Sequence, residues 1–314
     1  MVLSRRTRRI LLAVLLYAVF CILTGIYVAD GSLRPPRRPL TEDETGAVRA
    51  SAHSLDAELQ DVSITAADGA VLRAWAIRPN HNNNRNDVIL LHGLGDNRGG
   101  MIGYAQMLLA HGFTVLMPDA RAHGVSGGEF ATFGLLERED IHQWFEFLEG
   151  KDHPRCIFGF GESMGAAQLL QSLDERADFC AVVAESPFAS FREIAYDRMG
   201  QPFHAGPWIG RTLLRSVVEV GFVRARWKYK LNMGRISPED SVAGSEVPVL
   251  LIHGQADSNI PVRHSRLIHE RNPATELWEV PGADHCGAIS TAPQEFEQRV
   301  LGWFAGHSTS NRKQ

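Results

Sequence analysis

Short apolar runs alternate along most of the chain with longer segments whose apolar residues recur at helical spacing. The short runs predict buried strands, because a strand covered on both faces is apolar throughout. The segment 141–148 carries apolar residues at i, i+3, i+4 and i+7, which predicts one buried face of a helix. Strands are expected at 58–65, 70–78, 87–91, 113–117, 155–160, 179–184, 247–252 and 276–280, and further helices at 97–111, 164–173, 262–271 and 293–304.

This alternation predicts an α/β fold, with a mostly parallel sheet of eight strands and helices on both faces. The first two strand signals are separated by Asp68-Gly69, a dipeptide typical of a tight hairpin turn. We therefore expect an antiparallel pair of strands at the edge of the sheet.

The first thirty residues differ from the rest of the chain. Arginines occupy positions 5, 6, 8 and 9, and the run from Ile10 to Ala29 contains 20 residues and no charge. A helix of that length rises about 30 Å, enough to cross the hydrocarbon core of a bilayer. A cleavable signal peptide normally has a shorter apolar run that ends at small residues, and Tyr27-Val28-Ala29 is a poor cleavage site. We therefore expect residues 1–30 to be an uncleaved, single-span membrane anchor.

The charges on either side of this run bear on its orientation. Four arginines precede it, whereas Arg34, Arg37 and Arg38 follow it closely. The positive-inside rule narrowly favours a cytoplasmic N-terminus. The rest of the chain is then expected on the extracytoplasmic side.

The segment 31–57 is expected to be a linker. It contains the stiff, extended stretch LRPPRRPL, and no apolar periodicity appears before Leu59. A globular domain is expected at 58–306 and a short tail at 307–314. Within that domain about sixty residues separate Ser186-Pro187 from the strand that begins at Val247, which is more than one crossover helix needs. We interpret 188–246 as an insertion.

The composition limits the classes of partner and cofactor that we expect. The 314 residues include 32 lysines and arginines against 36 aspartates and glutamates, so the net charge of −4 gives no reason to expect nucleic-acid binding. The sequence contains no zinc-ligand spacing, phosphate-binding loop or dinucleotide fingerprint, and we expect neither a metal nor an organic cofactor. Of the four cysteines, Cys156 and Cys180 each begin a predicted strand. A disulfide between them would need an oxidising compartment, and we expect two buried free thiols instead.

One motif carries the chemistry. Gly161-Glu162-Ser163-Met164-Gly165 has the pattern G-x-S-x-G and lies between a predicted strand and a predicted helix. This spacing predicts a sharp turn that exposes the Ser163 hydroxyl, because glycines on both sides leave room for it. The helix that follows favours developing negative charge at its N-terminus, where the Met164 N–H can face an oxyanion.

With these residues the chain resembles the α/β-hydrolase superfamily, from about Glu58 to Phe304. The sequence HGQAD at 253–257 is similar to the acid loop of that family, and PGADH at 281–285 is similar to its histidine loop. The resemblance implies Ser163 as the nucleophile, His285 as the general acid and base, and Asp257 as the carboxylate that orients the histidine. Two rival acids are Asp284, which adjoins His285, and Glu185, which follows the sixth strand.

The resemblance also implies the residues of an oxyanion hole. His92-Gly93-Leu94-Gly95 resembles the HGxG loop of the family, so the Leu94 N–H is expected to act with the Met164 N–H. We expect His92 to hold this loop by hydrogen bonds rather than to act as a base. The motif at 119–128 is expected to brace the same loop, and His253 is expected to be a surface or loop residue.

The insertion at 188–246 corresponds to a small helical cap in the family. The resemblance implies a serine hydrolase of the carboxylesterase type, acting on a small-molecule or lipid ester and held to the membrane by its N-terminal helix. A serine peptidase or amidase and an acyltransferase would use the same residues. A non-catalytic binding protein on this fold is the fourth hypothesis, and it has no need of a complete triad.

Overall fold

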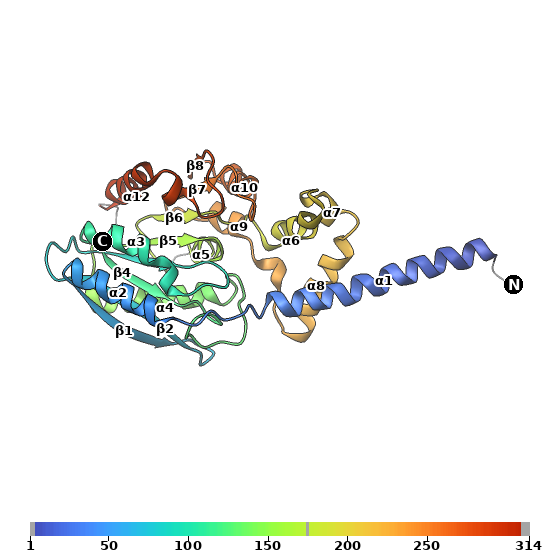
Figure 1. Cartoon of the computed structure of the whole chain (residues 1–314), viewed down its shortest axis with the longest axis horizontal. Coiled ribbons are helices and arrows are strands. Elements are labelled where there is room, and N and C mark those ends of the chain that lie inside the picture. Colours follow the sequence, from blue (N-terminus) through green and yellow to red (C-terminus); the bar gives the residue numbers. More distant parts are fainter. Residues whose placement is uncertain (1–3, 174–175, 309–314) are drawn as a thin grey trace. The chain divides into compact units, whose positions relative to one another are not determined.

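The computed structural model describes residues 4–173 and 176–308. It separates into two compact units, one formed by residues 1–34 and 191–235 and the other by residues 35–190 and 236–314. The larger unit contains the sheet, and the smaller one combines the N-terminal helix with helices from the middle of the chain (Figure 1).

Eight strands form one sheet in the order β1-β2-β4-β3-β5-β6-β7-β8 (Figure 1). The pairs β1·β2 and β2·β4 are antiparallel, and the other five pairs are parallel. The α/β-hydrolase fold expected from the sequence is therefore confirmed, including its antiparallel edge. The strands are β1 (Ala57–Thr65), β2 (Val71–Pro79), β3 (Asn86–Leu91), β4 (Thr114–Pro118), β5 (Cys156–Glu162), β6 (Val182–Glu185), β7 (Val249–Gly254) and β8 (Glu276–Val280).

Helices cover both faces of this sheet, because side chains of each inner strand alternate between two separate apolar cores. Val88 and Leu90 of β3 pack in the core beneath α2, α3 and α12, whereas Ile89 and Leu91 pack in the core beneath α4, α5 and α10. The helices of this unit are α2 (Glu42–Ser54), η1 (Arg98–Met101), α3 (Ile102–Ala110), α4 (Glu137–Asp152), α5 (Met164–Leu170), α9 (Pro238–Ala243), α10 (Arg263–Arg271), α11 (Ala288–Thr291) and α12 (Pro293–His307).

Helix α2 lies within the segment that the sequence led us to interpret as a linker. Its N-terminus is closed by a capping box, in which the side chains of Thr41 and Glu44 each bond the backbone N–H of the other residue. The helix is largely polar, yet Val48 and Ala52 are buried in the core that also contains α3 and α12. The expectation of a tether across 31–57 is therefore wrong for this helical stretch, because two small apolar residues suffice to dock it.

The smaller unit is helical and consists of α1 (Arg5–Ser32), α6 (Phe191–Gly200), η2 (Gln201–Phe203), α7 (Pro207–Arg211), α8 (Arg215–Lys228) and η3 (Met233–Arg235). Within the described part of the chain, α1 is the one helix long and apolar enough to cross a membrane. Its buried residues are Cys21, Gly25 and Ala29, which recur every fourth position and so lie on one face.

This face of α1 packs against α8 (Figure 1). The backbones approach so closely that a Cβ atom on Gly25 would lie 2.7 Å from the carbonyl oxygen of Val217. At the end of the contact, Arg224 donates two hydrogen bonds to the Asp30 carboxylate, of 3.0 and 2.9 Å. Lys228 Nζ lies 3.4 Å from the same carboxylate. Apolar packing and charge thus join two segments that are distant in the sequence.

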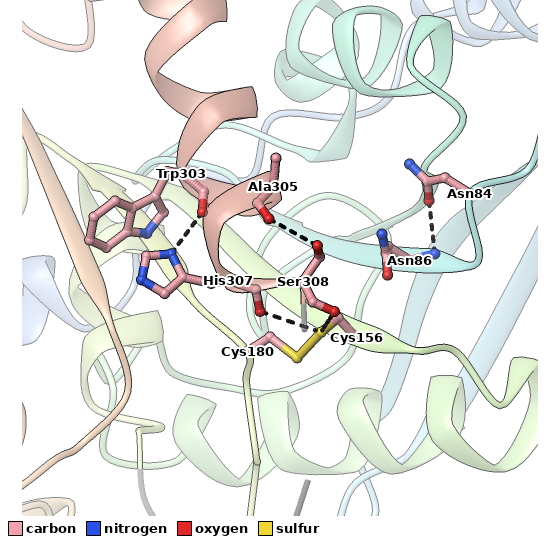
Figure 2. The surroundings of a disulfide bond; sticks show 8 residues. All are labelled: Asn84, Asn86, Cys156, Cys180, Trp303, Ala305, His307 and Ser308. Atoms are coloured by element: carbon pink, nitrogen blue, oxygen red, sulfur yellow. Dashed lines mark hydrogen bonds between the residues drawn. A yellow bond between two sulfur atoms is a disulfide. The ribbon is translucent and has the colours of Figure 1, made fainter. Parts of the chain in front are cut away.

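Cys156 and Cys180 form a disulfide, so the expectation of two free thiols is wrong (Figure 2). Cys156 begins β5, and Cys180 lies two residues before β6, its parallel neighbour in the sheet. Both sulfur atoms therefore lie at the same edge of the sheet, with Cα atoms 5.7 Å apart. The carbonyl oxygens of His307 and Ser308, at the end of α12, lie 3.8 and 3.4 Å from Cys156 Sγ (Figure 2).

Candidate active site

Ser163 lies on a sharp turn between β5 and α5. Its backbone has φ 52° and ψ −114°, a conformation that is rare for any residue other than glycine, and its N–H donates a 2.8 Å hydrogen bond to the Glu185 carbonyl. The flanking glycines are required. A Cβ on Gly161 would lie 2.6 Å from the carbonyl carbon of Gly165, and one on Gly165 would lie 2.3 Å from the Leu91 carbonyl oxygen. Larger residues at these positions would force the turn open.

The structure brings Ser163, His285 and Asp257 into one hydrogen-bonded chain. His285 Nε2 lies 2.9 Å from Ser163 Oγ, and His285 Nδ1 lies 2.8 Å from Asp257 Oδ2. Asp257 follows β7 and His285 follows β8, while Ser163 follows β5. Because these strands are parallel, their carboxyl ends meet at one edge of the sheet, where the three side chains converge.

Asp257 is held as a carboxylate by several donors. Its Oδ1 atom accepts from the backbone N–H groups of Asn259 and Ile260, at 2.9 and 2.7 Å. Burial works to raise the pKa of Asp257, but hydrogen bonds from His253 and His285 outweigh burial and hold this pKa well below its ordinary value. The carboxylate is therefore ionised at neutral pH.

His253 is fully buried beside this carboxylate, so the expectation that it is a surface or loop residue is wrong. Its Nε2 atom lies 2.8 Å from the Ile260 carbonyl oxygen and 3.3 Å from Asp257 Oδ2. Both neighbours of Nε2 are acceptors, so Nε2 carries the proton. Nδ1 then accepts from the Ser265 hydroxyl at 2.6 Å.

The two rival acids have other partners. Asp284 Oδ1 accepts from the N–H of His285, at 2.8 Å, and from the N–H and hydroxyl of Ser258, at 2.9 and 3.0 Å. Glu185 is buried at the end of β6, where its carboxylate meets Tyr104 and the backbone N–H of Ala288. Neither contact orients the His285 ring, whereas the contact of Asp257 does.

The backbones of the expected oxyanion hole meet beside Ser163. A Cβ on Gly93 would lie 3.5 Å from the Ser163 Cβ atom, so the loop after β3 passes directly over the serine. Leu94 follows Gly93 on this loop, and Met164 follows Ser163 as the first residue of α5. Leu94 is 47% exposed, whereas Met164 is buried at 2%.

His92 and the motif at 119–128 support this loop, as the sequence led us to expect. His92 Nδ1 lies 2.8 Å from the Gly93 carbonyl oxygen, and His92 Nε2 accepts from the Ala120 N–H at 3.0 Å. Burial, together with the neighbouring His123, lowers the pKa of His92 to about 4, so its ring is neutral. Asp119 accepts in turn from the N–H groups of Arg98 and Val125, at 2.8 and 2.9 Å.

Sequence reasoning named Glu185 but missed that Glu185 and Glu162 share a hydrogen-bond partner near Ser163. Tyr104 of α3 places its hydroxyl 3.2 Å from Glu162 Oε2 and 3.1 Å from Glu185 Oε2. Glu162 is the residue before Ser163 in the G-x-S-x-G motif, and a charged side chain at that position was the available signal. Among residues 4–173 and 176–308, no group of three or more His, Cys, Asp or Glu side chains could hold a metal ion.

Comparison with known proteins identifies the family of the chain. Residues 88–299 match the model of a family described as the alpha/beta hydrolase family. The uncharacterized protein YqkD of Bacillus subtilis is 27% identical over 243 residues, which cover 76% of each chain. The uncharacterized membrane protein YNL320W of Saccharomyces cerevisiae is 25% identical over 73% of this chain and 74% of its own. The crystal structure of the Pyrococcus furiosus esterase Pf2001 superposes with a TM-score of 0.68 at 27% identity, covering 88% of this chain and 99% of the esterase.

Proposed function

Because the chain belongs to the alpha/beta hydrolase family, we propose that it is a serine hydrolase that cleaves carboxylic esters through an acyl-enzyme on Ser163. One observation carries the proposal, namely the hydrogen-bonded chain from Ser163 Oγ through the His285 ring to Asp257. The likeness to a solved esterase over nearly the whole length of that enzyme supports an ester as the substrate.

In this proposal each group has a role in two half-reactions. Ser163 Oγ attacks the ester carbonyl carbon and gives its proton to His285 Nε2, while Asp257 stabilises the imidazolium through Nδ1. The N–H groups of Leu94 and Met164 stabilise the oxyanion of the tetrahedral intermediate. The carbon–oxygen bond to the alcohol then breaks, and His285 protonates the leaving oxygen. Water attacks the acyl-enzyme by the same route and releases the acid.

The proposal includes a place for the enzyme in the cell. Helix α1 anchors the chain in a membrane, and the large unit lies on the extracytoplasmic side. The Cys156–Cys180 disulfide supports this side, because disulfides persist in oxidising compartments and are rare in the cytosol. The four arginines that precede the apolar run support the same orientation. A small-molecule or lipid ester is then the substrate class.

The test is labelling of the full chain, in membranes or detergent, with a fluorophosphonate probe. Wild type should be labelled and Ser163→Ala should not. A matched control is Ser63→Ala on β1, an exposed serine whose loss should leave labelling unchanged. Labelling that survives in Ser163→Ala would place the nucleophile elsewhere, and well-folded wild type that is not labelled would favour a non-catalytic protein.

A second measurement separates ester hydrolysis from the related reactions. Hydrolysis of p-nitrophenyl esters of increasing acyl length, beside matched p-nitroanilides, should show cleavage of the esters alone. Preferential cleavage of the anilides would instead indicate an amidase or peptidase. An acyltransferase would reveal itself by a faster release of p-nitrophenol when an added alcohol replaces water as the acceptor.

A further inference from the structure

The Tyr104 hydroxyl lies between two carboxyl groups and has one proton to donate. Its oxygen is 3.2 Å from Glu162 Oε2 and 3.1 Å from Glu185 Oε2, so both distances allow a hydrogen bond. Two ionised carboxylates could not both accept from Tyr104, because a phenol has one proton to donate. Both contacts are satisfied together if one carboxyl is protonated, because it then donates to the Tyr104 oxygen while Tyr104 donates to the other.

The surroundings of the pair also oppose a double negative charge. Glu185 is 1% exposed, and burial is the largest cause that raises the pKa of each carboxyl. The charge of Glu162 raises the pKa of Glu185 further, and the charges of both glutamates raise the pKa of Tyr104. Asp96, on the loop after β3, raises the pKa of Glu162, and Asp257, on the loop after β7, raises that of Glu185. His285 and the half-buried Cys286 lie near the pair on the loop after β8. In a low-dielectric interior, two close carboxylates ionise separately.

We infer that Glu162 and Glu185 hold one proton between them through Tyr104, and that this pair positions the two loops that flank Ser163. Glu162 lies against Gly93, which precedes Leu94 on the expected oxyanion loop, since a Cβ on Gly93 would lie 3.5 Å from Glu162 Oε1. Glu185 Oε1 accepts from the N–H of Ala288, three residues after His285, at 3.0 Å. Packing of Gly93 against Glu162 and hydrogen bonds through Tyr104 and Glu185 to Ala288 therefore join the oxyanion loop to the histidine loop near Ser163.

The shared proton also limits the charge close to the reaction. With it the pair carries one negative charge instead of two. A second negative charge beside Ser163 would oppose the oxyanion that develops in the transition state. This catalytic consequence rests on the proposed serine hydrolase function, whereas the sharing of the proton does not.

Infrared spectroscopy of the full chain tests the sharing directly. The carbonyl stretch of a protonated carboxyl group should appear in wild type at neutral pH. The spectrum of the double variant Glu162→Gln/Glu185→Gln is subtracted, which removes the bands of other buried acids. In either single variant the remaining carboxyl loses its charged neighbour, so its band should disappear at lower pH than in wild type. Glu270→Gln, an exposed control on α10, should leave the band unchanged. Bands that titrate at the same pH in wild type and in the single variants would overturn the proposal.

Ester hydrolysis tests the positioning role. Wild-type kcat should fall at alkaline pH as the shared proton leaves, and the fall should be absent from Glu162→Gln, which has no second carboxyl to ionise. Tyr104→Phe breaks the path between the loops and should lower kcat about tenfold with little change in KM. An unchanged alkaline limb in Glu162→Gln would overturn this role. If wild type is not labelled by the fluorophosphonate, but the infrared bands of wild type and the single variants still titrate at different pH, the proposed function is wrong and the shared proton stands.

Discussion

His253 Nε2 lies 3.3 Å from Asp257 Oδ2, and both side chains are completely excluded from solvent. Replacing His253 by leucine removes a donor from this carboxylate and leaves the Ile260 carbonyl and the Ser265 hydroxyl unpaired. We expect a loss of about 1–3 kcal/mol in the free energy of unfolding, measured by urea denaturation, together with a lower kcat/KM. The control His81→Gln, at an 82% exposed side chain, should change neither quantity. Equal stability of the two variants would show that His253 does not support Asp257.

Asp257→Asn should lose far more activity than Glu185→Gln. An asparagine at position 257 can no longer stabilise the imidazolium or fix its tautomer, and the same change in serine proteases costs roughly 10⁴-fold in kcat. Glu185 has no hydrogen bond to the His285 ring among those of the described chain, so its amide variant should lose about tenfold or less. Initial rates on a p-nitrophenyl ester decide the order. The reverse order would transfer the acid role to Glu185.

The buried carboxyl group of Asp87 should make the stability of the protein depend on pH, and this effect does not involve the candidate active site. Burial, with the nearby charge of Asp152, raises the pKa of Asp87 from 3.8 to about 7. The folded state therefore binds more protons than the unfolded state between these values, and the free energy of unfolding falls as pH rises from about 4 to 7. Asp87→Asn should remove this fall, so at pH 8 the variant should be more stable than wild type by at most about 4 kcal/mol.

Urea denaturation at pH 5 and pH 8 measures this effect. The control is Asp61→Asn on β1, where the side chain is 75% exposed and the fall with pH should persist. If Asp87→Asn has the same pH dependence as wild type, the carboxyl is ionised in the folded protein at both pH values.

The Cys156–Cys180 disulfide closes a loop across 24 positions of sequence separation. Removing it with Cys156→Ser/Cys180→Ser should lower the free energy of unfolding by about 3 kcal/mol, chiefly because the unfolded chain regains freedom. Wild type in a reducing buffer should lose a similar amount, and the double variant should be insensitive to the reductant. Wild type isolated from its native membrane with two alkylatable thiols at these positions would contradict the oxidising compartment that we propose.

Gly25 and Gly31 form a matched pair for testing the contact between α1 and α8. A Cβ on Gly25 would lie 2.7 Å from the Val217 carbonyl oxygen, whereas a Cβ on Gly31 would meet nothing within 4 Å. Gly25→Ala should therefore loosen α8 and speed proteolysis within residues 191–235, and Gly31→Ala should not. Equal rates of cleavage in the two variants would mean that the helices do not pack in the membrane-bound protein.

The sequence predicted the sheet well because its strands are short, apolar throughout and separated by clear helical signals. Predicted and observed strands differ by a few residues at their ends, as at 179–184 against β6 (Val182–Glu185). The residues expected at the site were also placed close together, since Ser163, Asp257 and His285 all follow parallel strands. Their catalytic roles await the activity measurements above.

Features that depend on contacts between distant residues were not predictable from local pattern. Helix α2 is polar on most of its surface, and of its three buried residues only Val48 and Ala52 are apolar, which is too few for an apolar pattern to stand out in the sequence. Tyr104 and Glu162 are 58 positions apart, and nothing along the chain connects them. His253 was identified as part of a motif, but its burial follows from the folding of residues 257–265 around its ring. The disulfide likewise depends on two strand starts becoming neighbours.

The salt bridge between Asp30 and Arg224 has a consequence for the synthesis of this protein. The two residues are 194 positions apart, and α1 leaves the ribosome first. At about 5–20 residues per second, its partner helix follows about 10–40 s later. During that interval nothing from α8 packs against Gly25, and the Asp30 carboxylate has neither Arg224 nor Lys228 as a partner. Helix α1 is therefore synthesised without its packing partner, and α8 emerges after strands β1 to β6 and before β7 and β8.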